Sequence, residues 1–552
     1  MAMTATRQET LASTAGAPAV EGADVEAVLG SGDHKTIGRL WIALSSLYLI
    51  GAAVLAVLAG IERIDLGSFD LVDDAEMYAQ LWSLARESLL FLGVVPLLIG
   101  VATYVVPLQV GSSTLAFPRG AAGAFWSWLV SGVLLVVATV VNGGPGGGRQ
   151  DFTSMWALAY AAVLISLLWA LVCVCTTVLG LRASGMTLDR APISAWSWLV
   201  FGTVAFATLP MMVAELALSY VRIRYGDLDS GAARVGLVAV TDTVSLAPGV
   251  LWFAIPVLGL LLEIVSAHAG AGLRQHRVAM SLVALFGVLA FGGHVLSFGT
   301  LRQLPLDNGV RVVELLLVPL VVLATLGLAA DTVRRGRPRL RSPLVAALVS
   351  GALLLLATLV VVLAQVEYVL RFIEELFDTS IDVPGWLTVS DTSMHDGVRV
   401  LVVGAALVAG IGGLLHWGHK IYGRALDERL GTATVGLVAL GTALWGIADV
   451  VSGLLNQPRE PFATADVKDG VEALNGAGTA GAAILALGLV LLAVNVVMSS
   501  LGRRGSVEEP WRGLTLEWAT PSPPPAGNFL EPPVVRSVTP LADPAPGEET
   551  LR

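Results

Sequence analysis

The sequence predicts an all-α polytopic membrane protein with twelve transmembrane helices, and three observations carry this prediction. Hydrophobic residues make up 55% of the 552-residue chain, and the mean hydropathy is +0.76. Charged residues make up only 14%, against about 25% in a typical soluble chain. The apolar residues fall into blocks of roughly 20, the length of a helix that crosses a bilayer. A soluble enzyme, a disulfide scaffold and a nucleic-acid binder are therefore excluded.

The predicted domain organisation is one membrane domain, residues 36–500, between two tails. Residues 1–35 are polar and rich in Ala and Gly, which predicts a disordered cytoplasmic N-tail. Residues 501–552 are rich in proline, which predicts a disordered cytoplasmic tail without a packed core. The twelve spans are expected at residues 38–61, 80–107, 121–142, 155–181, 193–218, 242–266, 278–300, 310–330, 342–366, 396–416, 432–456 and 474–499.

The distribution of Lys and Arg predicts the orientation. If both termini lie on one side, that side holds most of the 33 Lys and Arg, whereas the opposite loops are rich in Asp and Glu. Because basic loops stay in the cytoplasm, both termini are expected on the cytoplasmic side of a bacterial-type plasma membrane. The net charge of −10 then reflects the outer loops and tails, and not an acidic partner.

Several short motifs resemble one known family. In order and at consistent spacing, they are similar to motifs of subunit I of the haem–copper terminal oxidases (the cytochrome c oxidase type), and the resemblance covers about residues 33–500. The motifs are Asp33–Leu40, Tyr104–Gly111, Ala116–Arg119, Thr176–Thr177, Leu181–Leu188, Pro256–Gly259, Glu263–Ile264 and Pro458–Arg459. The resemblance implies a twelve-helix bundle like that of cytochrome c oxidase subunit I.

The resemblance also implies histidine ligands for two haems and one copper ion, and most of these are missing. Metal ligation needs a lone pair from imidazole, thiolate or thioether. In span 2, Pro96 and Pro107 fix the register, and the position of the low-spin haem ligand falls on Ala85. In span 10, counting from Trp417 places the two haem-ligand positions on Gly397 and Arg399. Counting instead from the start of that span shifts them by one residue, to Val398 and Val400.

The copper site retains one matching residue. The three copper-ligand positions fall on Ala247 in span 6 and on Gly293 and His294 in span 7. His294 is therefore the one candidate metal ligand, and the alternative is a core histidine that is hydrogen-bonded to a neighbour. In the last outer loop, a pair of arginines that bind haem propionates in the family becomes Arg459–Glu460, so Arg459 is the residual member of that clamp.

Four charged residues lie where the resemblance places the low-spin haem. Charges inside a bilayer are costly and persist where they are paired or functional. Arg86 and Glu87 directly follow the span-2 ligand position, Arg399 occupies a facing position in span 10, and Asp396 lies at the entrance to that span. We expect a salt-bridge network that replaces haem, with Glu87 facing Arg399 and Arg86 facing Asp396. The alternative is that Arg86 extends outward and that Arg399 faces a loop carbonyl.

Three functions follow as hypotheses. The first is a degenerate oxidase-type subunit, without the haem and copper electron path, that acts as a structural or regulatory component beside other respiratory-complex-type membrane subunits. The second is a working terminal oxidase that couples O₂ reduction to proton pumping, and only this hypothesis requires haem and copper. The third is a transporter that uses the emptied haem cavities. No cofactor is expected under the first hypothesis, and no nucleic-acid partner under any of them.

Overall fold

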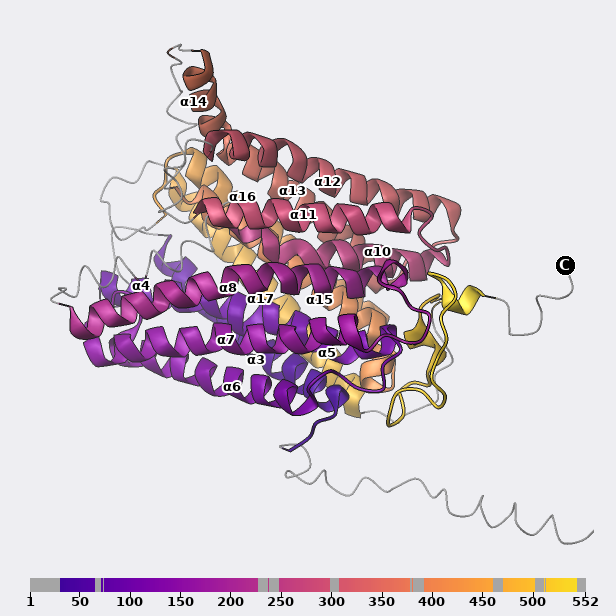
Figure 1. Ribbon diagram of the computed structural model, residues 1–552. Helices are drawn as coiled ribbons and strands as arrows, with labels where there is room; N and C mark the ends of the chain where they lie inside the picture. The colour runs from indigo at the N-terminus through magenta and orange to yellow at the C-terminus, as the bar shows by residue number, and fades with distance from the viewer. Residues whose placement is uncertain are drawn as a thin grey trace, which may run out of the picture.

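The computed structural model describes residues 30–64, 71–72, 74–226, 237, 248–297, 307–377, 380, 392–459, 470–501, 511 and 513–543. Within these residues, twelve helical segments are long and apolar enough to cross a membrane. The predicted all-α membrane protein with twelve spans is therefore confirmed. The helices run side by side between two ends of a bundle (Figure 1).

The helices agree with the predicted spans and are mostly a few residues longer. Span 2 consists of three consecutive elements that together run from Ala75 to Gln109. Positions 242–247 of predicted span 6 lie outside the described residues. The elements are α3 (His34–Glu62), α4 (Ala75–Glu87), η1 (Ser88–Val94), α5 (Val95–Gln109), α6 (Pro118–Ala138), η2 (Thr139–Gly143), α7 (Gln150–Gly180), η3 (Leu188–Arg190), α8 (Ile193–Tyr225), η4 (Gly249–Ala254), α10 (Ile255–Ala269), α11 (His276–Ser297), α12 (Asp307–Arg335), α13 (Ser342–Ala364), α14 (Val366–Phe377), α15 (Met394–Tyr422), α16 (Glu428–Leu454), α17 (Val471–Leu501), η7 (Leu516–Ala519) and η8 (Pro540–Ala542).

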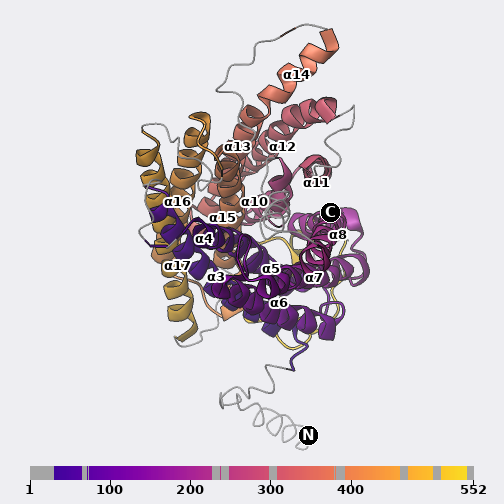
Figure 2. The same cartoon turned by 90° about the vertical axis from the view of Figure 1, so that its left-hand side faces the viewer.

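Two spans form the interior of the bundle. The most apolar parts of Ala75–Gln109 and of α15 are completely buried within the protein, and α5 and α15 both lie among the other helices in Figure 2. A helix that is apolar all round is typically surrounded by other helices. Outer spans instead bury one stripe and expose apolar residues, as α6 does with Val130 and Val133. The charged residues singled out in spans 2 and 10 therefore lie on the two innermost helices.

Small residues allow the helices on one side to approach closely. A Cβ atom added to Gly441 of α16 would lie 2.5 Å from the backbone nitrogen of Leu485 in α17. A Cβ atom added to Gly481 of α17 would lie 2.5 Å from the backbone nitrogen of Trp445 in α16. Glycines at such positions let two membrane helices pack backbone to backbone.

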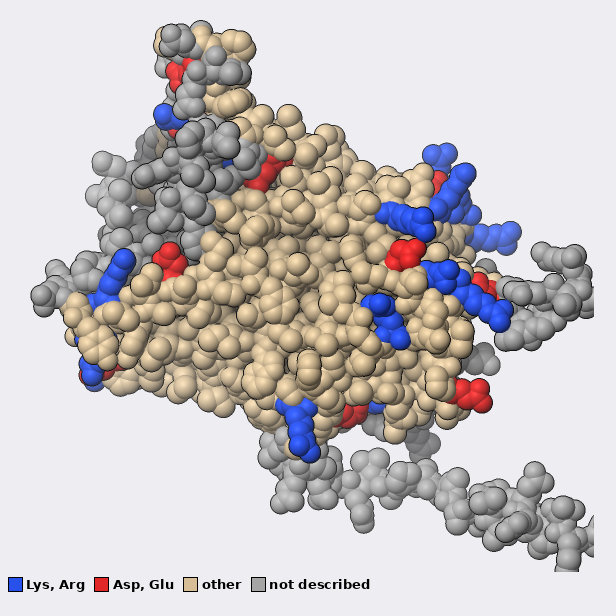
Figure 3. Space-filling model, in the orientation of Figure 1, with Lys and Arg blue, Asp and Glu red and all other residues tan. Residues whose placement is uncertain are grey.

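The two ends of the bundle differ in charge. We call the end where α3 begins the termini end, because the C-terminal segment, residues 513–543, lies there too, and the other the distal end (Figure 1). On the face drawn in Figure 3, Lys and Arg gather mainly at the termini end, and a broad band between the two ends is almost free of charge. An uncharged band of this kind is what a bilayer requires.

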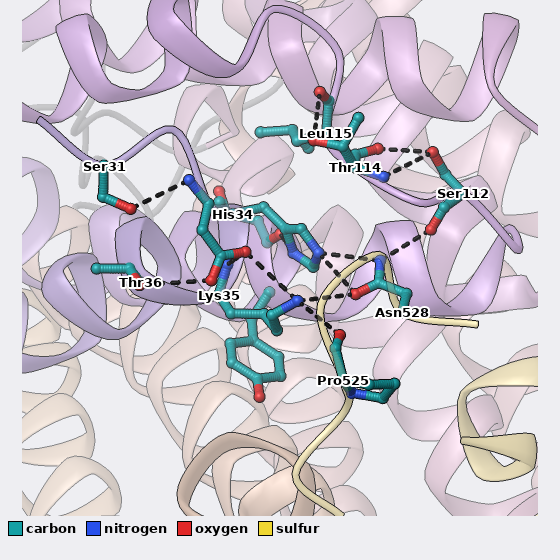
Figure 4. A network of polar contacts seen from close by, with 12 residues as sticks. Ser31, His34, Lys35, Thr36, Ser112, Thr114, Leu115, Pro525 and Asn528 are labelled. Carbon is teal, nitrogen blue, oxygen red and sulfur yellow. Dashed lines mark hydrogen bonds and ion pairs between the residues drawn. The ribbon is translucent and has the colours of Figure 1, made fainter. Parts of the chain in front are cut away.

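The prediction that residues 501–552 form a disordered tail is wrong for the C-terminal segment. Leu516, Trp518 and Val535 are buried against the termini end. Asn528 Nδ2 donates a hydrogen bond to the backbone oxygen of Ser112 at 2.8 Å (Figure 4). Prolines prevent this segment from forming a long helix, but its aromatic and polar side chains fill gaps between helix ends. The buried side chains of the segment thus pack against the helix bundle.

Candidate functional site

The candidate site begins where α4 changes into η1. The α4 helix is capped at its start by Asp74, whose side chain accepts a hydrogen bond from the backbone nitrogen of Met77. It ends at Glu87, and the π-helical η1 follows directly from Ser88. Wide turns of this kind inside longer helices often mark functional positions. Arg86 and Glu87 therefore lie at a change of helical geometry within the second span.

Glu87 is the most buried member of the charged group. Its side chain is 2% exposed, and its Oε1 atom lies 3.3 Å from Arg399 Nη1. Its Oε2 atom accepts a hydrogen bond of 2.7 Å from the Tyr160 hydroxyl on α7. The structure thus brings together the pair expected from the sequence, and Tyr160 is an additional partner that the sequence analysis missed.

Arg399 binds two groups of the second span at once. Besides its ion pair with Glu87, its Nη2 atom donates a hydrogen bond of 2.8 Å to the backbone oxygen of Arg86. The carbonyl contact of the alternative interpretation therefore exists as well, although the carbonyl belongs to a helix and not to a loop. The planar guanidinium group serves both partners in one orientation.

Arg86 lies inside the bundle and does not extend outward. Its guanidinium carbon lies 4.1 Å from the centre of the Trp82 ring, within the range of a cation–π contact. Its Nη1 atom lies 3.4 Å from Asp396 Oδ1, and its Nε atom lies 3.6 Å from Glu87 Oε1. Both carboxylates of the expected network therefore face Arg86.

Asp396 connects this group to the loop after α16. Its Oδ1 atom lies 3.6 Å from Arg459 Nε. The loop is held in place by backbone contacts, because Thr392 pairs with Pro458 and the nitrogen of Ser393 donates to the oxygen of Gln457 at 3.0 Å. Arg459, expected as the residual half of a propionate clamp, thus joins the same network.

Arg63 and Asp449 form a second buried pair that the sequence analysis did not predict. Arg63 Nη1 lies 2.9 Å from Asp449 Oδ1. Burial by itself lowers the pKa of Arg63, but Asp449, together with Tyr78 and Asp396, outweighs this effect and raises that pKa above its usual value. The sequence indicates that Asp449 is buried, because it lies within an apolar stretch. Arg63 lies one residue beyond α3, at a span end where a side chain can also reach water, so its burial could not be predicted.

These pairs surround a cavity between four helices. Its empty space amounts to about 650 Å³, including its open side. Arg63, Arg86, Arg399, Asp396 and Asp449 contribute its polar wall. The remaining lining is mainly apolar and is formed by Ala56, Ala59, Gly60, Tyr78, Trp82, Ala85, Leu89, Val400, Val403 and Trp445.

The residues at the expected low-spin haem positions do not fit haem. Ala85 is buried at 5% exposure and carries no donor atom. A guanidinium group has no lone pair to offer to iron, and that of Arg399 is already bound to Glu87 and to the Arg86 carbonyl. In the other register, Val398 and Val400 are equally unable to ligate a metal.

His294, the candidate copper ligand, lies in the core of the bundle. It is fully buried, and its ring meets the Trp252 ring edge-on, with the centroids 6.3 Å apart. Among the described residues, no three His, Cys, Asp or Glu side chains are grouped as a metal ion would require. Gly293 lies next to it and offers no ligand, and position Ala247 lies outside the described residues. His294 as a copper ligand stays a prediction that the arrangement does not support.

Comparisons with known proteins agree with the fold. The family model described as "Cytochrome C and Quinol oxidase polypeptide I" matches residues 36–376. The chain is 25% identical to cytochrome c oxidase subunit 1 of Alkalihalophilus pseudofirmus, over 92% of this chain and 81% of the relative. It is 28% identical to cytochrome c oxidase subunit 1 of Synechocystis, over 91% of this chain and 90% of the relative.

A solved structure shows the same arrangement of helices. It is a heme–copper terminal oxidase dimer determined by cryo-electron microscopy, and one of its chains superposes with a TM-score of 0.64. The match covers 86% of this chain and 85% of that chain, at 13% sequence identity. The fold therefore persists where few residues are shared, and the match of the family model extends over more than half of the chain. The chain is an integral membrane protein that belongs to the cytochrome c and quinol oxidase polypeptide I family.

Proposed function

We propose that this protein is a non-redox member of its family that acts as a structural or regulatory component of a respiratory membrane complex. One observation carries the proposal, namely the buried contact of 3.3 Å between Arg399 Nη1 and Glu87 Oε1. Arg399 stands at a position where the resemblance expects a haem ligand, and Glu87 lies two residues beyond the facing position. The two groups bind each other in the space between their helices.

The energetics of this pair favour the proposal. Removing one member of a buried ion pair leaves an uncompensated charge, which typically destabilises a protein by about 3–5 kcal/mol. A haem between α4 and α15 would have to separate Glu87 from Arg399 and would gain no ligand from Ala85 or Arg399 in return. The network therefore stabilises a cofactor-free bundle at this place.

An absorption spectrum with metal analysis tests the loss of the electron path. The full-length protein is purified in mild detergent, and a reduced-minus-oxidised spectrum is recorded together with its iron and copper content. The oxidase of the solved structure, produced in the same host, controls for the supply of haem and copper. We expect haem and copper in the control and neither in stoichiometric amounts in this protein. Two haems and one copper per chain would show a working terminal oxidase instead.

Co-purification tests the proposed partners. The family relatives carry the names of oxidase subunits, and the solved relative is a dimer. We expect other respiratory-complex-type subunits to co-purify with this chain from native membranes in fixed ratio. If the chain is isolated alone and remains stable, the proposed role in a complex would be contradicted.

We also propose that the termini end faces the cytoplasm. The gathering of Lys and Arg at that end supports this orientation (Figure 3), because basic loops are retained on the cytoplasmic side. A C-terminal fusion to green fluorescent protein, which fluoresces in the cytoplasm but not after export in unfolded form, should be fluorescent. A dark fusion with an active periplasmic reporter at the same position would reverse the orientation.

A further inference from the structure

One buried arginine beside the cavity has an unused pair of donors. Arg63 is 8% exposed and lines the cavity. Its Nη1 atom is engaged by Asp449 at 2.9 Å, whereas Nε and Nη2 have no hydrogen-bond partner among the residues that the structure describes. Nε and Nη2 form one edge of the guanidinium plane, and their two N–H groups point in parallel. Such an edge matches the two oxygens of a carboxylate or a phosphate.

Nearby carboxylates are committed to other partners. Glu62, next to Arg63 in the chain, accepts hydrogen bonds from the backbone nitrogens of Leu71 and Val72. Asp396 lies between Arg86 and Arg459, at 3.4 Å and 3.6 Å from their nitrogens. Three arginines and two aspartates line the cavity. Glu87, which pairs with Arg399 and Arg86, compensates the third arginine. It is therefore the free Nε/Nη2 edge of Arg63, and not a net charge of the wall, that offers a place to an added anion.

The rest of the cavity suits a hydrocarbon chain. Next to Arg63, α3 contributes only the small residues Ala56, Ala59 and Gly60 to the wall. Trp445 of α16 and Val400 and Val403 of α15 also line the cavity. A ligand bound here would thus meet a charged fork at one end and an apolar surface along its length. Pockets of mainly apolar lining with a few placed polar groups are typical binding sites for small molecules.

We propose that this cavity binds an amphipathic oxyanion, with its carboxylate or phosphate on the Nε/Nη2 edge of Arg63 and its hydrocarbon chain along α3 and Trp445. Two sources share this chemistry: a free fatty acid and the headgroup of an anionic phospholipid. The proposal extends beyond the proposed structural role, and a spectrum without haem neither supports nor contradicts it.

Quenching of tryptophan fluorescence measures the binding. Dibromostearic acid is titrated into the full-length protein in mild detergent, because bromine quenches nearby indoles and Trp82 and Trp445 line the cavity. We expect saturable quenching that is largely lost in Trp82→Phe/Trp445→Phe. The methyl ester of the same acid, which lacks the oxyanion, should quench at least about tenfold more weakly. Equal quenching by acid and ester would overturn the proposal.

Variants of Arg63 and Asp449 test the fork. Asp449→Asn retains the free edge of Arg63 and should bind dibromostearic acid at least as tightly as the wild type. Arg63→Gln/Asp449→Asn removes the fork without leaving a buried charge unpaired, and it should weaken binding by about tenfold or more. Equal affinities of these two variants would overturn the proposal. The thermal unfolding midpoints of both variants check that they fold.

Two further measurements keep the test decisive. If the double variant does not fold, Arg63→Lys, which keeps the charge but lacks the planar fork, should still weaken binding by several-fold, and wild-type affinity in it would contradict the assigned contact. A brominated phosphatidic acid distinguishes the two sources. Tighter binding of this lipid than of the fatty acid assigns the site to a phospholipid headgroup, and the reverse order assigns it to a free fatty acid. Binding of neither probe would overturn the proposal.

Discussion

Arg399 on α15 and Glu87 at the end of α4 form a buried ion pair, with 3.3 Å between Nη1 and Oε1. Their side chains are 4% and 2% exposed, so water does little to solvate either charge. The Tyr160 hydroxyl donates a hydrogen bond to Glu87 Oε2, and the Arg86 carbonyl accepts one from Arg399 Nη2. Because removal from water is costly for each ion, the two charges depend on each other.

Breaking this pair from one side should destabilise the protein strongly. Arg399→Met leaves the buried Glu87 carboxylate with only the more distant Arg86 guanidinium, 3.6 Å away, and we expect the free energy of unfolding to fall by about 3 kcal/mol, the lower end of the usual range for a broken buried pair. Arg399→Met/Glu87→Gln removes both charges and should regain most of the loss. Thermal unfolding of the wild type, the two single variants and the double variant in detergent gives the coupling energy. Additive effects of the two single substitutions would show that the contact contributes nothing.

The apolar stretches of the sequence predict the fold, and the family resemblance places Glu87 and Arg399 opposite each other in two of the spans. A charge within an apolar stretch needs a partner inside the protein. The positions of Glu87 and Arg399 in the sequence therefore already indicate that both side chains are paired. Arg63 lies at a span end, where a side chain can equally reach water, and its pairing with Asp449 depends on the tertiary arrangement. The position of Asn528 beside His34 likewise depends on shape and on hydrogen bonds between distant parts of the chain. The amino-acid composition of the C-terminal segment does not predict these contacts.

The close contact of α16 and α17 predicts a sharp difference between two glycines of one helix. Gly441→Val would force a side chain against the backbone of Leu485, and we expect a loss of about 1–3 kcal/mol in the free energy of unfolding. Gly436→Val is the matched control, because a Cβ atom there meets nothing within 4 Å. Unfolding midpoints measured in the same detergent compare the two. Equal midpoints would show that the helices are not packed at Gly441.

Asn528 should hold the C-terminal segment on the bundle. Its Oδ1 atom accepts a hydrogen bond of 3.2 Å from Lys35 Nζ, and its Nδ2 atom donates to Ser112 (Figure 4). Asn528→Ala removes both of these buried hydrogen bonds, at a cost of about 1–3 kcal/mol. We expect faster hydrogen exchange in residues 513–543 and little change in the spans. Leu530→Ala, at a side chain that is 90% exposed, is the control, and equal exchange in both variants would contradict the role of Asn528.

The attachment of the C-terminal segment should depend on pH through Glu517. This side chain is fully buried, and its Oε1 atom accepts hydrogen bonds from Gln109 Nε2 at 3.2 Å and from Trp417 Nε1 at 3.4 Å. Burial raises the pKa of Glu517 above its ordinary value of 4.5. The folded protein therefore holds the proton of this carboxyl more tightly than the unfolded chain does.

The sign of the pH effect follows from this difference. A carboxyl whose pKa is raised by folding stabilises the folded state below its ordinary pKa, and this contribution is lost as the pH rises through the raised value. Glu517→Gln keeps an acceptor oxygen and has no charge to bury. We therefore expect the variant to exceed the wild type in unfolding midpoint by a margin that is larger at about pH 8 than at about pH 5. Glu531→Gln, at an exposed position of the same segment, should show no such margin. A margin for Glu517→Gln that is independent of pH, or that favours the wild type at high pH, would show that the carboxyl is not buried in the way the structure describes.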